Sequence, residues 1–393
     1  MARPTGLLLT GGGARAAYQV GVLEAIAHLR RSAGAGHAAN PFPIIAGTSA
    51  GAINAAALAC GADDFDAVVR RIAELWHNVS VEQVYQADAL AMLGSGARWR
   101  QMLGLGRFVR SILHIQPRSL LDNAPLAEFL KRKVPLDRLP ALMQAGHVQA
   151  LAVTASSYSS GEHVTFFQSA VPVDPWVRSQ RHAVCCPLTH EHLMASSAIP
   201  FVFPATPLKV ADHVEYFGDG AMRQSAPLSP TIHLGAEHIL VIGAGRMTEP
   251  DEQLAPNTHT GYPTLAQIAG HAMSSIFLDS LGVDIERVDR INATLALVPP
   301  ELRTTAALRP LELLVISPSE RLDVIASRHV AALPAAVRHL FGGMNADGIH
   351  HVKGAALASY LLFDPGFTRE LMALGRTDTL HKREAVLRFF GWA

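Results

Sequence analysis

The sequence of 393 residues has few cysteines, no long apolar run and no excess of charge of either sign. Its three cysteines cannot form the disulfide framework of a small secreted protein, and so few thiols are typical of a reducing compartment. The 33 basic and 33 acidic residues balance, so no overall field favours a nucleic acid. No apolar run approaches the roughly 20 residues that span a bilayer, and the first expected strand leaves no room for a signal peptide. We therefore expect a cytoplasmic protein that binds no nucleic acid.

Motifs that hold metal ions or nucleotide phosphates are also missing. No C-x-x-C or H-E-x-x-H spacing occurs, and His190-x-His192 near the pair Cys185-Cys186 is too weak a pattern to predict a metal site. A G-x-x-x-x-G-K-[ST] loop is absent as well. We expect neither a metal nor a cofactor.

The segment Gly47-Thr48-Ser49-Ala50-Gly51 has the G-x-S-x-G pattern of a nucleophile elbow, a tight turn that presents a serine between a strand and a helix. The apolar residues 43–46 are typical of a buried strand, and the alanine-rich residues 52–59 of a helix. A side chain at either glycine would crowd the turn. At the start of a helix, Ser49 also lies near N–H groups and the positive end of the helix dipole, which stabilise a developing anion.

Three consecutive glycines, Gly11-Gly12-Gly13, follow another expected strand at residues 6–10. Uncovered glycine amides can hold a phosphate or the oxyanion of an acyl-transfer intermediate. The spacing Gly11-x-Gly13-x-x-Ala16 also fits a dinucleotide fingerprint, which expects an acidic residue about 20 positions later. No acidic residue lies between Glu24 and Asp63, which disfavours the nucleotide alternative.

With two further segments, these motifs resemble the patatin-like phospholipase family. Ala195-Ser196-Ser197-Ala198-Ile199-Pro200, followed by Phe203-Pro204, is similar to the family's A-S-x-A-x-P stretch, and Asp219-Gly220-Ala221 is similar to its D-G-[GA] turn. Order and spacing match from Gly6 to Gly245. The resemblance implies an α/β fold, a three-layer α/β/α sandwich with a mostly parallel central sheet and a C-terminal helical extension. The alternation of expected strands and helices also favours this class.

The resemblance implies a role for individual residues. Ser49 matches the nucleophile, and Asp219 matches the acid/base partner of a Ser–Asp dyad. The implied oxyanion hole comprises Gly11, Gly12 and Gly13 with the accompanying Arg15 and the N–H of Ala50, and the motif glycines are Gly47, Gly51 and Gly220. The chain departs from the family pattern at Ala16, usually glycine, and at Ser225, near a position that is often asparagine.

A dyad of this kind also has a chemical basis. A serine hydroxyl needs a base to remove its proton, and an aspartate can serve if burial raises its pKa. Gly218 and Gly220 flank Asp219 after an expected strand at residues 214–217. A Ser-His-Asp triad stays an open alternative, because histidines follow the aspartate, and we consider four of them: His233, His238, His259 and His271.

The remaining pattern predicts strands at 147–155, 163–168, 239–243 and 311–316, and helices at 63–77, 125–133, 264–295 and 352–362. We expect a patatin-like catalytic domain over residues 1–245 and a C-terminal helical extension, residues 246–393, packed on the same core. Residues 94–113 mix four arginines with Trp99 and Phe108, which suits either an interfacial flap or a surface helix packed on the core.

The sequence therefore predicts a serine acyl hydrolase of phospholipids or other lipid esters that acts through an acyl-enzyme. Its expected partners are the lipid ester and, transiently, a membrane surface. The sequence does not define its oligomeric state. Two alternatives stay open: an acyltransferase that uses the same acyl-enzyme, and a non-catalytic lipid-binding regulator.

Overall fold

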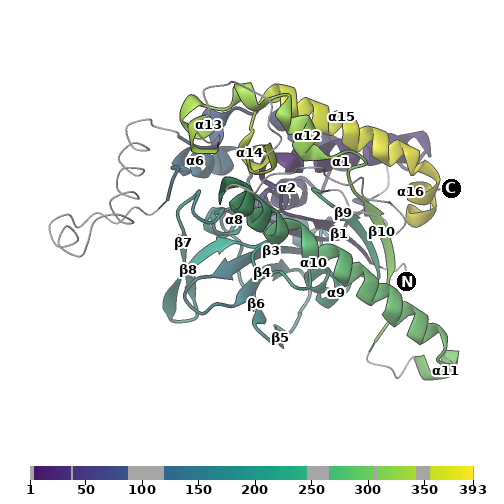
Figure 1. Ribbon diagram of the computed structural model, residues 1–393. Helices are drawn as coiled ribbons and strands as arrows, with labels where there is room; N and C mark the ends of the chain where they lie inside the picture. Colours follow the sequence, from purple (N-terminus) through teal and green to yellow (C-terminus); the bar gives the residue numbers. More distant parts are fainter. Residues whose placement is uncertain are drawn as a thin grey trace.

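The computed structural model describes residues 4–36, 39–86, 119–245, 265–303, 308–341 and 355–392. Within these residues, ten strands form one sheet (Figure 1). The strands are β1 (Thr5–Leu9), β2 (Ile44–Thr48), β3 (Ala150–Ser157), β4 (His163–Ser169), β5 (Val177–Arg178), β6 (Arg181–Cys185), β7 (Thr206–Val210), β8 (His213–Asp219), β9 (His238–Ile242) and β10 (Glu312–Ile316).

The strand order is β10-β9-β1-β2-β3-β4-β6-β5, and the neighbours from β10 to β3 are all parallel. Strand β4 runs antiparallel to β3, while the hairpin β7–β8 attaches to β3 through β8. Because the carboxyl ends of parallel strands share one edge, the loops after β1, β2 and β3 gather at the same place. This edge carries the motifs described above.

Helices connect the strands and continue to the C-terminus. They are α1 (Ala17–Ser32), α2 (Ala50–Ala59), α3 (Phe65–His77), α4 (Val81–Val84), α6 (Ala124–Lys133), α7 (Leu139–Gln144), α8 (His190–Ser196), α9 (Ser229–His233), α10 (Leu265–Ala296), α11 (Pro300–Arg303), α12 (Leu322–Ser327), α13 (Ala335–Phe341), α14 (Ala355–Leu361), α15 (Pro365–His381) and α16 (Arg383–Phe390). Short 3₁₀ helices cover Gly13–Ala16, Leu136–Arg138 and Val330–Ala332.

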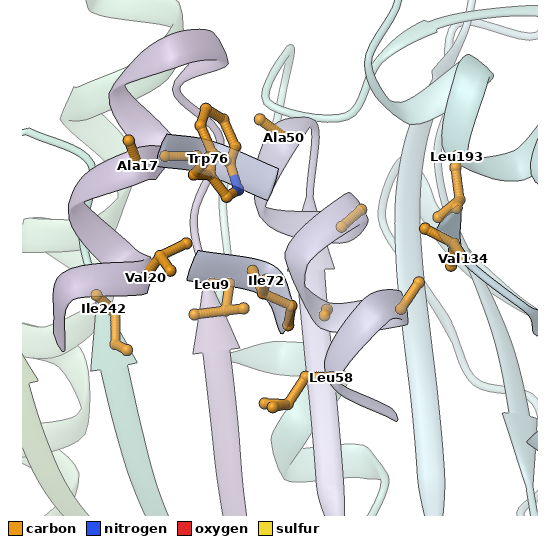
Figure 2. Packing of buried hydrophobic residues seen from close by; sticks show 14 of the residues in the cluster. Leu9, Ala17, Val20, Ala50, Leu58, Ile72, Trp76, Val134, Leu193 and Ile242 are labelled. Carbon is orange, nitrogen blue, oxygen red and sulfur yellow. The ribbon is translucent and has the colours of Figure 1, made fainter. Parts of the chain in front are cut away.

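Alternation along the central strands divides the core into two layers. Leu7 and Leu9 of β1 face a large cluster with helices α1, α2, α3 and α15, whereas Leu8 faces a smaller cluster with α9 and α10. Figure 2 shows the larger cluster, where Leu9, Val20 and Ile72 lie close together. Helices thus cover both faces of a mostly parallel sheet, which confirms the expected three-layer α/β/α sandwich.

The C-terminal third packs on the same core as the N-terminal motifs. Helix α15 crosses α1 closely, because Gly21 lies against the backbone of Met372 and Gly375 against the backbone of Tyr18. The Tyr18 hydroxyl donates a 2.9 Å hydrogen bond to Asp378. Strand β10 extends the sheet beyond β9. The domain boundary at residue 245 stays a prediction.

No helix among the described residues is long and apolar enough to cross a membrane. The segment 94–113, predicted as a flap or a surface helix, lies outside the described residues.

Candidate active site

The serine and the aspartate of the two motifs meet on one edge of strand β3. Strand β2 pairs with β3 as far as Thr48, which lies opposite Thr154, while β4 occupies the other edge. Strand β8 arrives from the opposite direction and ends at Asp219, opposite Ala155. Ser49 follows Thr48 directly and therefore lies next to Asp219. The Ser49 hydroxyl donates a 2.6 Å hydrogen bond to Asp219 Oδ2.

The backbone of Ser49 has the strained geometry of a nucleophile elbow. Its φ of 56° and ψ of −131° are unusual for a residue with a side chain, and such strain costs about 1–3 kcal/mol. The flanking glycines allow α2 to pass close to the strands. A Cβ at Gly47 would lie 2.6 Å from the Cα of Ala52, and a Cβ at Gly51 would overlap the carbonyl oxygen of Leu9.

Asp219 is fully buried, and its carboxylate contacts only a few polar groups. Burial raises the pKa of Asp219 to about 7, although hydrogen bonds from the Ser49 hydroxyl and the Ala221 N–H favour the ionised form. Gly220 lets the turn pass against the carbonyl of Thr154, which a side chain would overlap. The carboxylate is therefore ionised over part of the physiological pH range, in direct contact with a hydroxyl.

Ser196 holds both halves of this pair, a role that the motif alone did not reveal. Its Oγ accepts a 2.8 Å hydrogen bond from the N–H of Ser49, and its carbonyl accepts a 3.1 Å bond from the N–H of Gly220. Two residues later, the carbonyl of Ala198 accepts from the N–H of Asp219 at 2.9 Å. The segment after α8 thus fixes the serine and the aspartate relative to one another.

The three glycines of the N-terminal loop lie beside the serine. A Cβ at Gly11 would lie 3.1 Å from the Cβ of Ser49. In the part of the chain that the structure describes, the N–H groups of Gly12, Gly13 and Ala50 make no hydrogen bond. The N–H of Ala50 belongs to the first turn of α2, where amides lack partners within the helix. These N–H groups can donate hydrogen bonds to an anion at the serine.

The Arg15 side chain, by contrast, contacts the C-terminal third. Its Nε donates a 2.7 Å hydrogen bond to Ser359, its Nη1 donates to the Tyr360 hydroxyl at 3.3 Å, and the guanidinium lies 4.1 Å from the centre of the Tyr360 ring. Gly13, with a φ of 55°, packs against the Tyr360 carbonyl so tightly that a side chain would overlap it. These contacts hold the guanidinium against α14, and a role of Arg15 in the oxyanion hole stays a prediction.

Two of the four histidines considered for a triad are engaged elsewhere. The ring of His233 stacks on Trp176, with its centroid 4.5 Å away, and His238 lies 3.6 Å from Glu312 on the neighbouring strand. The side chains of His259 and His271 lie outside the described residues. No described histidine hydrogen-bonds to Asp219 or Ser49.

A histidine that the sequence did not indicate, His163 on β4, contacts the aspartate turn. Its Nε2 lies 2.9 Å from the carbonyl oxygen of Gly220. Burial lowers the pKa of His163 to about 4, so the ring is neutral at physiological pH and its N–H donates to this carbonyl. His163 therefore supports the turn without touching the carboxylate.

The structure shows what lies at the two positions where the sequence departs from the family pattern. Ala16 ends the 3₁₀ turn after the glycines, is fully buried and accepts a 3.2 Å hydrogen bond from Asn54. Near Ser225, it is the neighbouring Gln224 that supplies a side-chain amide, which donates to the Thr48 hydroxyl at 2.9 Å. An amide thus lies close to the serine turn even without asparagine.

An apolar pocket opens beside Ser49. Ser49, Ile53 and Ala57 line it from one face of α2, because residues four apart lie on the same side of a helix. Other lining residues come from α3, α6 and the loop after α8. The exposed Lys133 is the charged lining residue.

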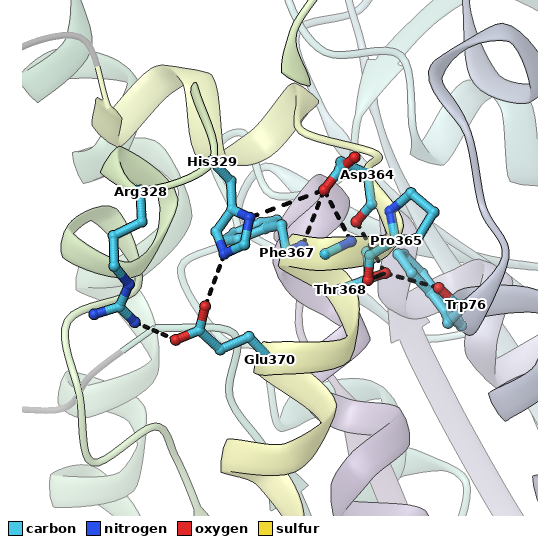
Figure 3. Close-up of polar contacts among 9 residues, drawn as sticks. Trp76, Arg328, His329, Asp364, Pro365, Phe367, Thr368 and Glu370 are labelled. Carbon is cyan, nitrogen blue, oxygen red and sulfur yellow. Dashed lines mark hydrogen bonds and ion pairs between the residues drawn. The ribbon is translucent and has the colours of Figure 1, made fainter. Parts of the chain in front are cut away.

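The C-terminal third supplies one wall of this pocket. Phe363 lines it and stacks on Trp76 with ring centroids 6.2 Å apart. The Thr368 hydroxyl donates a 2.8 Å hydrogen bond to the Trp76 carbonyl, and Asp364 caps α15 by accepting from the N–H of Phe367 (Figure 3). These contacts fix the wall between α3 and α15.

Comparisons with solved structures find weak similarities. VipD from Legionella pneumophila is 12% identical with a TM-score of 0.30, over 95% of this chain and 67% of that one. The type III effector ExoU is 12% identical with a TM-score of 0.30, over 94% of this chain and 54% of that one. ExoU from Pseudomonas aeruginosa, in its complex with SpcU, is 14% identical with a TM-score of 0.26, over 95% and 71%. No curated protein matches the sequence.

The sequence itself matches a family model. The model of the patatin-like phospholipases covers residues 7–232, more than half of the chain, and includes both glycine motifs, the serine and the aspartate. The geometry around Ser49 and the match agree, and the chain belongs to the patatin-like phospholipase family.

Proposed function

We propose that the protein is a serine acyl hydrolase in which Ser49 is the nucleophile and Asp219 the base. The observation that carries this proposal is the 2.6 Å hydrogen bond from the Ser49 hydroxyl to the buried Asp219 carboxylate. Ser49 Oγ attacks the carbonyl carbon of a lipid ester while Asp219 takes the hydroxyl proton. The proton then passes to the leaving alcohol as the ester C–O bond breaks.

The oxyanion of the tetrahedral intermediate is held by backbone N–H groups. Those of Gly12, Gly13 and Ala50 have no other partner among the described residues and lie in the loop and helix end next to Ser49. Such donors act on charge that develops only in the transition state, and removing one costs on the order of 10²–10³ in rate. Asp219 next takes a proton from the water that attacks the acyl-enzyme, and returns it to Ser49 Oγ as the bond between the acyl carbon and Oγ breaks and the fatty acid leaves.

The apolar pocket beside Ser49 suits the acyl chain of the substrate. Two of its polar wall residues are already paired: Trp76 Nε1 donates to Asn54 at 2.8 Å, and Asn54 donates to Gln19 at 3.0 Å. A hydrocarbon chain therefore gains contacts there without leaving a polar group unpaired, whereas a polar head group does not.

The experiment compares Ser49→Ala and Asp219→Asn with the wild-type protein on a short p-nitrophenyl ester and a fluorophosphonate probe. We expect Ser49→Ala to abolish labelling and to reduce kcat/KM by a factor of about 10³ or more, and Asp219→Asn to do nearly the same. Ser32→Ala and Asp174→Asn change exposed residues of the same types and serve as controls.

Thermal unfolding checks that all four variants fold. A well-folded Asp219→Asn protein with most of its activity would exclude the dyad and leave a histidine as the base. Labelling of Ser49→Ala at the wild-type rate would remove Ser49 as the nucleophile.

A further inference from the structure

The hairpin of β7 and β8 presents an apolar face to solvent. Val214 is 60% exposed and Tyr216 54% exposed, whereas Glu215 between them and Phe217 after them are buried. On the neighbouring strand, Lys209 lies opposite Val214 and Pro207 opposite Tyr216. Both are exposed. Side chains along each strand thus alternate between an exposed outer face and a buried inner face. Those on the outer face are apolar, aromatic or cationic.

This face lies at the edge of the sheet that carries the dyad. Asp219 pairs with Ala155, and β8 extends from there to His213, which is past the end of β3 at Ser157. At a rise of roughly 3.3 Å per residue, the hairpin reaches roughly 20 Å beyond the aspartate. Figure 1 shows β7 and β8 at the periphery of the molecule, outside β3 and β4.

Tyr158 joins the hairpin to the dyad turn. Its N–H donates a 2.8 Å hydrogen bond to the carbonyl of Tyr216, and its ring covers Gly218, where a side chain would overlap it. Its hydroxyl lies 3.7 Å from the sulfur of Met222, three residues after Asp219. Tyr158 is itself 48% exposed. We call Tyr158, Pro207, Val214 and Tyr216 the hairpin patch.

The charges around the hairpin patch are mainly cationic. Lys209 and Arg223 are exposed, and neither has an acidic partner among the described residues. The Arg223 guanidinium donates to the Gly161 carbonyl at 2.6 Å. Glu215 faces inward, where it accepts from Ser160 and pairs with His213. Asp212, in the turn of the hairpin, carries an opposing charge.

We propose that the hairpin patch docks the protein on the surface of an anionic phospholipid bilayer. The inference rests on the proposed function, because a lipid ester hydrolase meets its substrate at such a surface. Tyrosines are stable at the membrane interface, with the ring among apolar groups and the hydroxyl in water, while valine enters the apolar layer. Lys209 and Arg223 meet anionic head groups. Docking in this way holds β8, the strand that ends at Asp219, against the bilayer.

The test is co-sedimentation of the full chain with vesicles of phosphatidylcholine, with and without phosphatidylglycerol. We expect the double substitution Val214→Ser, Tyr216→Ser to weaken binding to both kinds of vesicle by about tenfold or more, because two partly exposed apolar side chains are lost. Lys209→Gln should weaken binding about fivefold, and only when phosphatidylglycerol is present. The kcat/KM for a soluble p-nitrophenyl ester should stay within about twofold of wild type for both variants.

The matched control is Val177→Ser, Leu380→Ser, which removes two exposed apolar side chains away from the hairpin. It should bind vesicles as the wild-type protein does. Thermal unfolding shows whether each variant folds, and Lys209→Gln keeps the test valid if the double variant does not.

Wild-type affinity in both hairpin variants would overturn the proposal, as would an equal loss in the control. Loss of a dimer in size-exclusion chromatography, with vesicle binding unchanged, would instead assign the patch to a second copy of the chain. A wild-type protein that docks through the patch but hydrolyses no ester, soluble or in vesicles, would leave docking intact and remove the proposed hydrolysis.

Discussion

Asp219 acts as a base only when it is ionised, and its burial makes ionisation costly. An ordinary aspartate is fully ionised near neutral pH but is too weak a base to remove a serine proton efficiently. Burial raises the pKa of Asp219 to about 7 and thereby increases its basicity, while the Ser49 hydroxyl and the Ala221 N–H retain part of the ionised form. In the proposed dyad, the raised pKa makes Asp219 a stronger base but lowers the fraction of Asp219 that is ionised at neutral pH.

This trade-off predicts the pH dependence of the reaction. The reactive, ionised fraction of Asp219 grows as pH rises through about 7. We expect kcat/KM for a soluble ester to fall about tenfold per pH unit below that value and to level off above it. Steady-state assays from about pH 5 to 9 measure the profile, with thermal unfolding at each pH as control. A rate that is flat, or that falls as pH rises through neutrality, would rule out an aspartate with this pKa as the base.

Sequence patterns identify the residues of the proposed dyad but not those that position them. Ser49 and Asp219 stand in local motifs, and the glycines next to them in the sequence indicate tight turns. Ser196 acts through a contact across 147 residues, and His163 through one across 57. Ser196 stands in the A-S-x-A-x-P segment, but that pattern does not predict its contact with Ser49, and His163 stands in no motif. The sequence pattern therefore predicts the proposed chemistry of the site better than it predicts the residues that hold the dyad in place.

Helix α2 connects the nucleophile to the pocket. Ser49, Ile53 and Ala57 lie on its pocket face, so the acyl chain has a path along the helix away from the ester carbonyl. At 1.5 Å per residue, the distance along the helix from Ser49 to Ala57 is roughly 12 Å. With roughly 1.5 Å carbon–carbon bonds in a zigzag, this corresponds to about nine or ten carbons.

The position of Ala57 predicts that it limits chain length. Ala57→Leu fills the pocket about two helical turns from Ser49, so we expect kcat/KM for p-nitrophenyl decanoate to fall about tenfold or more. The butyrate ester should react within about twofold of wild type, because its chain ends before this point. Ala33→Leu, which enlarges an exposed alanine, is the control. An equal loss for both esters would show that Ala57 does not face the acyl chain.

At this scale the parallel strands were the most predictable elements. The expected strands near β1, β2, β3, β9 and β10 exist, with ends shifted by up to three residues. Helix α15 was not predicted. It buries Phe367, Leu371 and Leu374, but Thr368, Gly375 and Thr379 are buried beside them, so small and polar residues interrupt the apolar repeat on which such predictions depend. Its close packing on α1 requires small residues, and small residues give a weak hydrophobic pattern.

In the whole molecule, the two ends of the sequence form one site. Arg15 and Gly13 contact α14, and Phe363 closes a wall of the pocket, although these C-terminal residues lie outside the segment that matches the family model. The sequence after residue 245 contains no motif that predicts this arrangement, because the contacts involve a backbone carbonyl and buried side chains. The strands of the central sheet, β10 among them, were predictable, whereas the contacts of α14 and Phe363 with the site were not.

This arrangement predicts that Arg15 positions the glycine loop. Arg15→Met removes the hydrogen bonds to Ser359 and Tyr360 but keeps an apolar stem in the buried site. We expect kcat to fall by about 10–100-fold with a smaller change in KM, because the loop donates mainly in the transition state. The rate of fluorophosphonate labelling should fall with kcat.

The control for this prediction is Arg70→Met, which alters an exposed arginine of α3. Thermal unfolding separates a loss of positioning from a loss of folding. If folded Arg15→Met protein is labelled at the wild-type rate, Arg15 contributes only to stability.

The contact between Arg15 and Ser359 joins residues that are 344 positions apart. A ribosome adds about 5–20 residues per second, so the glycine loop is made roughly 20–70 s before its partner. During synthesis, the serine motif and the aspartate are therefore present on a nascent chain whose glycine loop still lacks the contact between Arg15 and Ser359. Because the two partners are made so far apart in time, we expect the glycine loop to reach its final geometry only after α14 has been made.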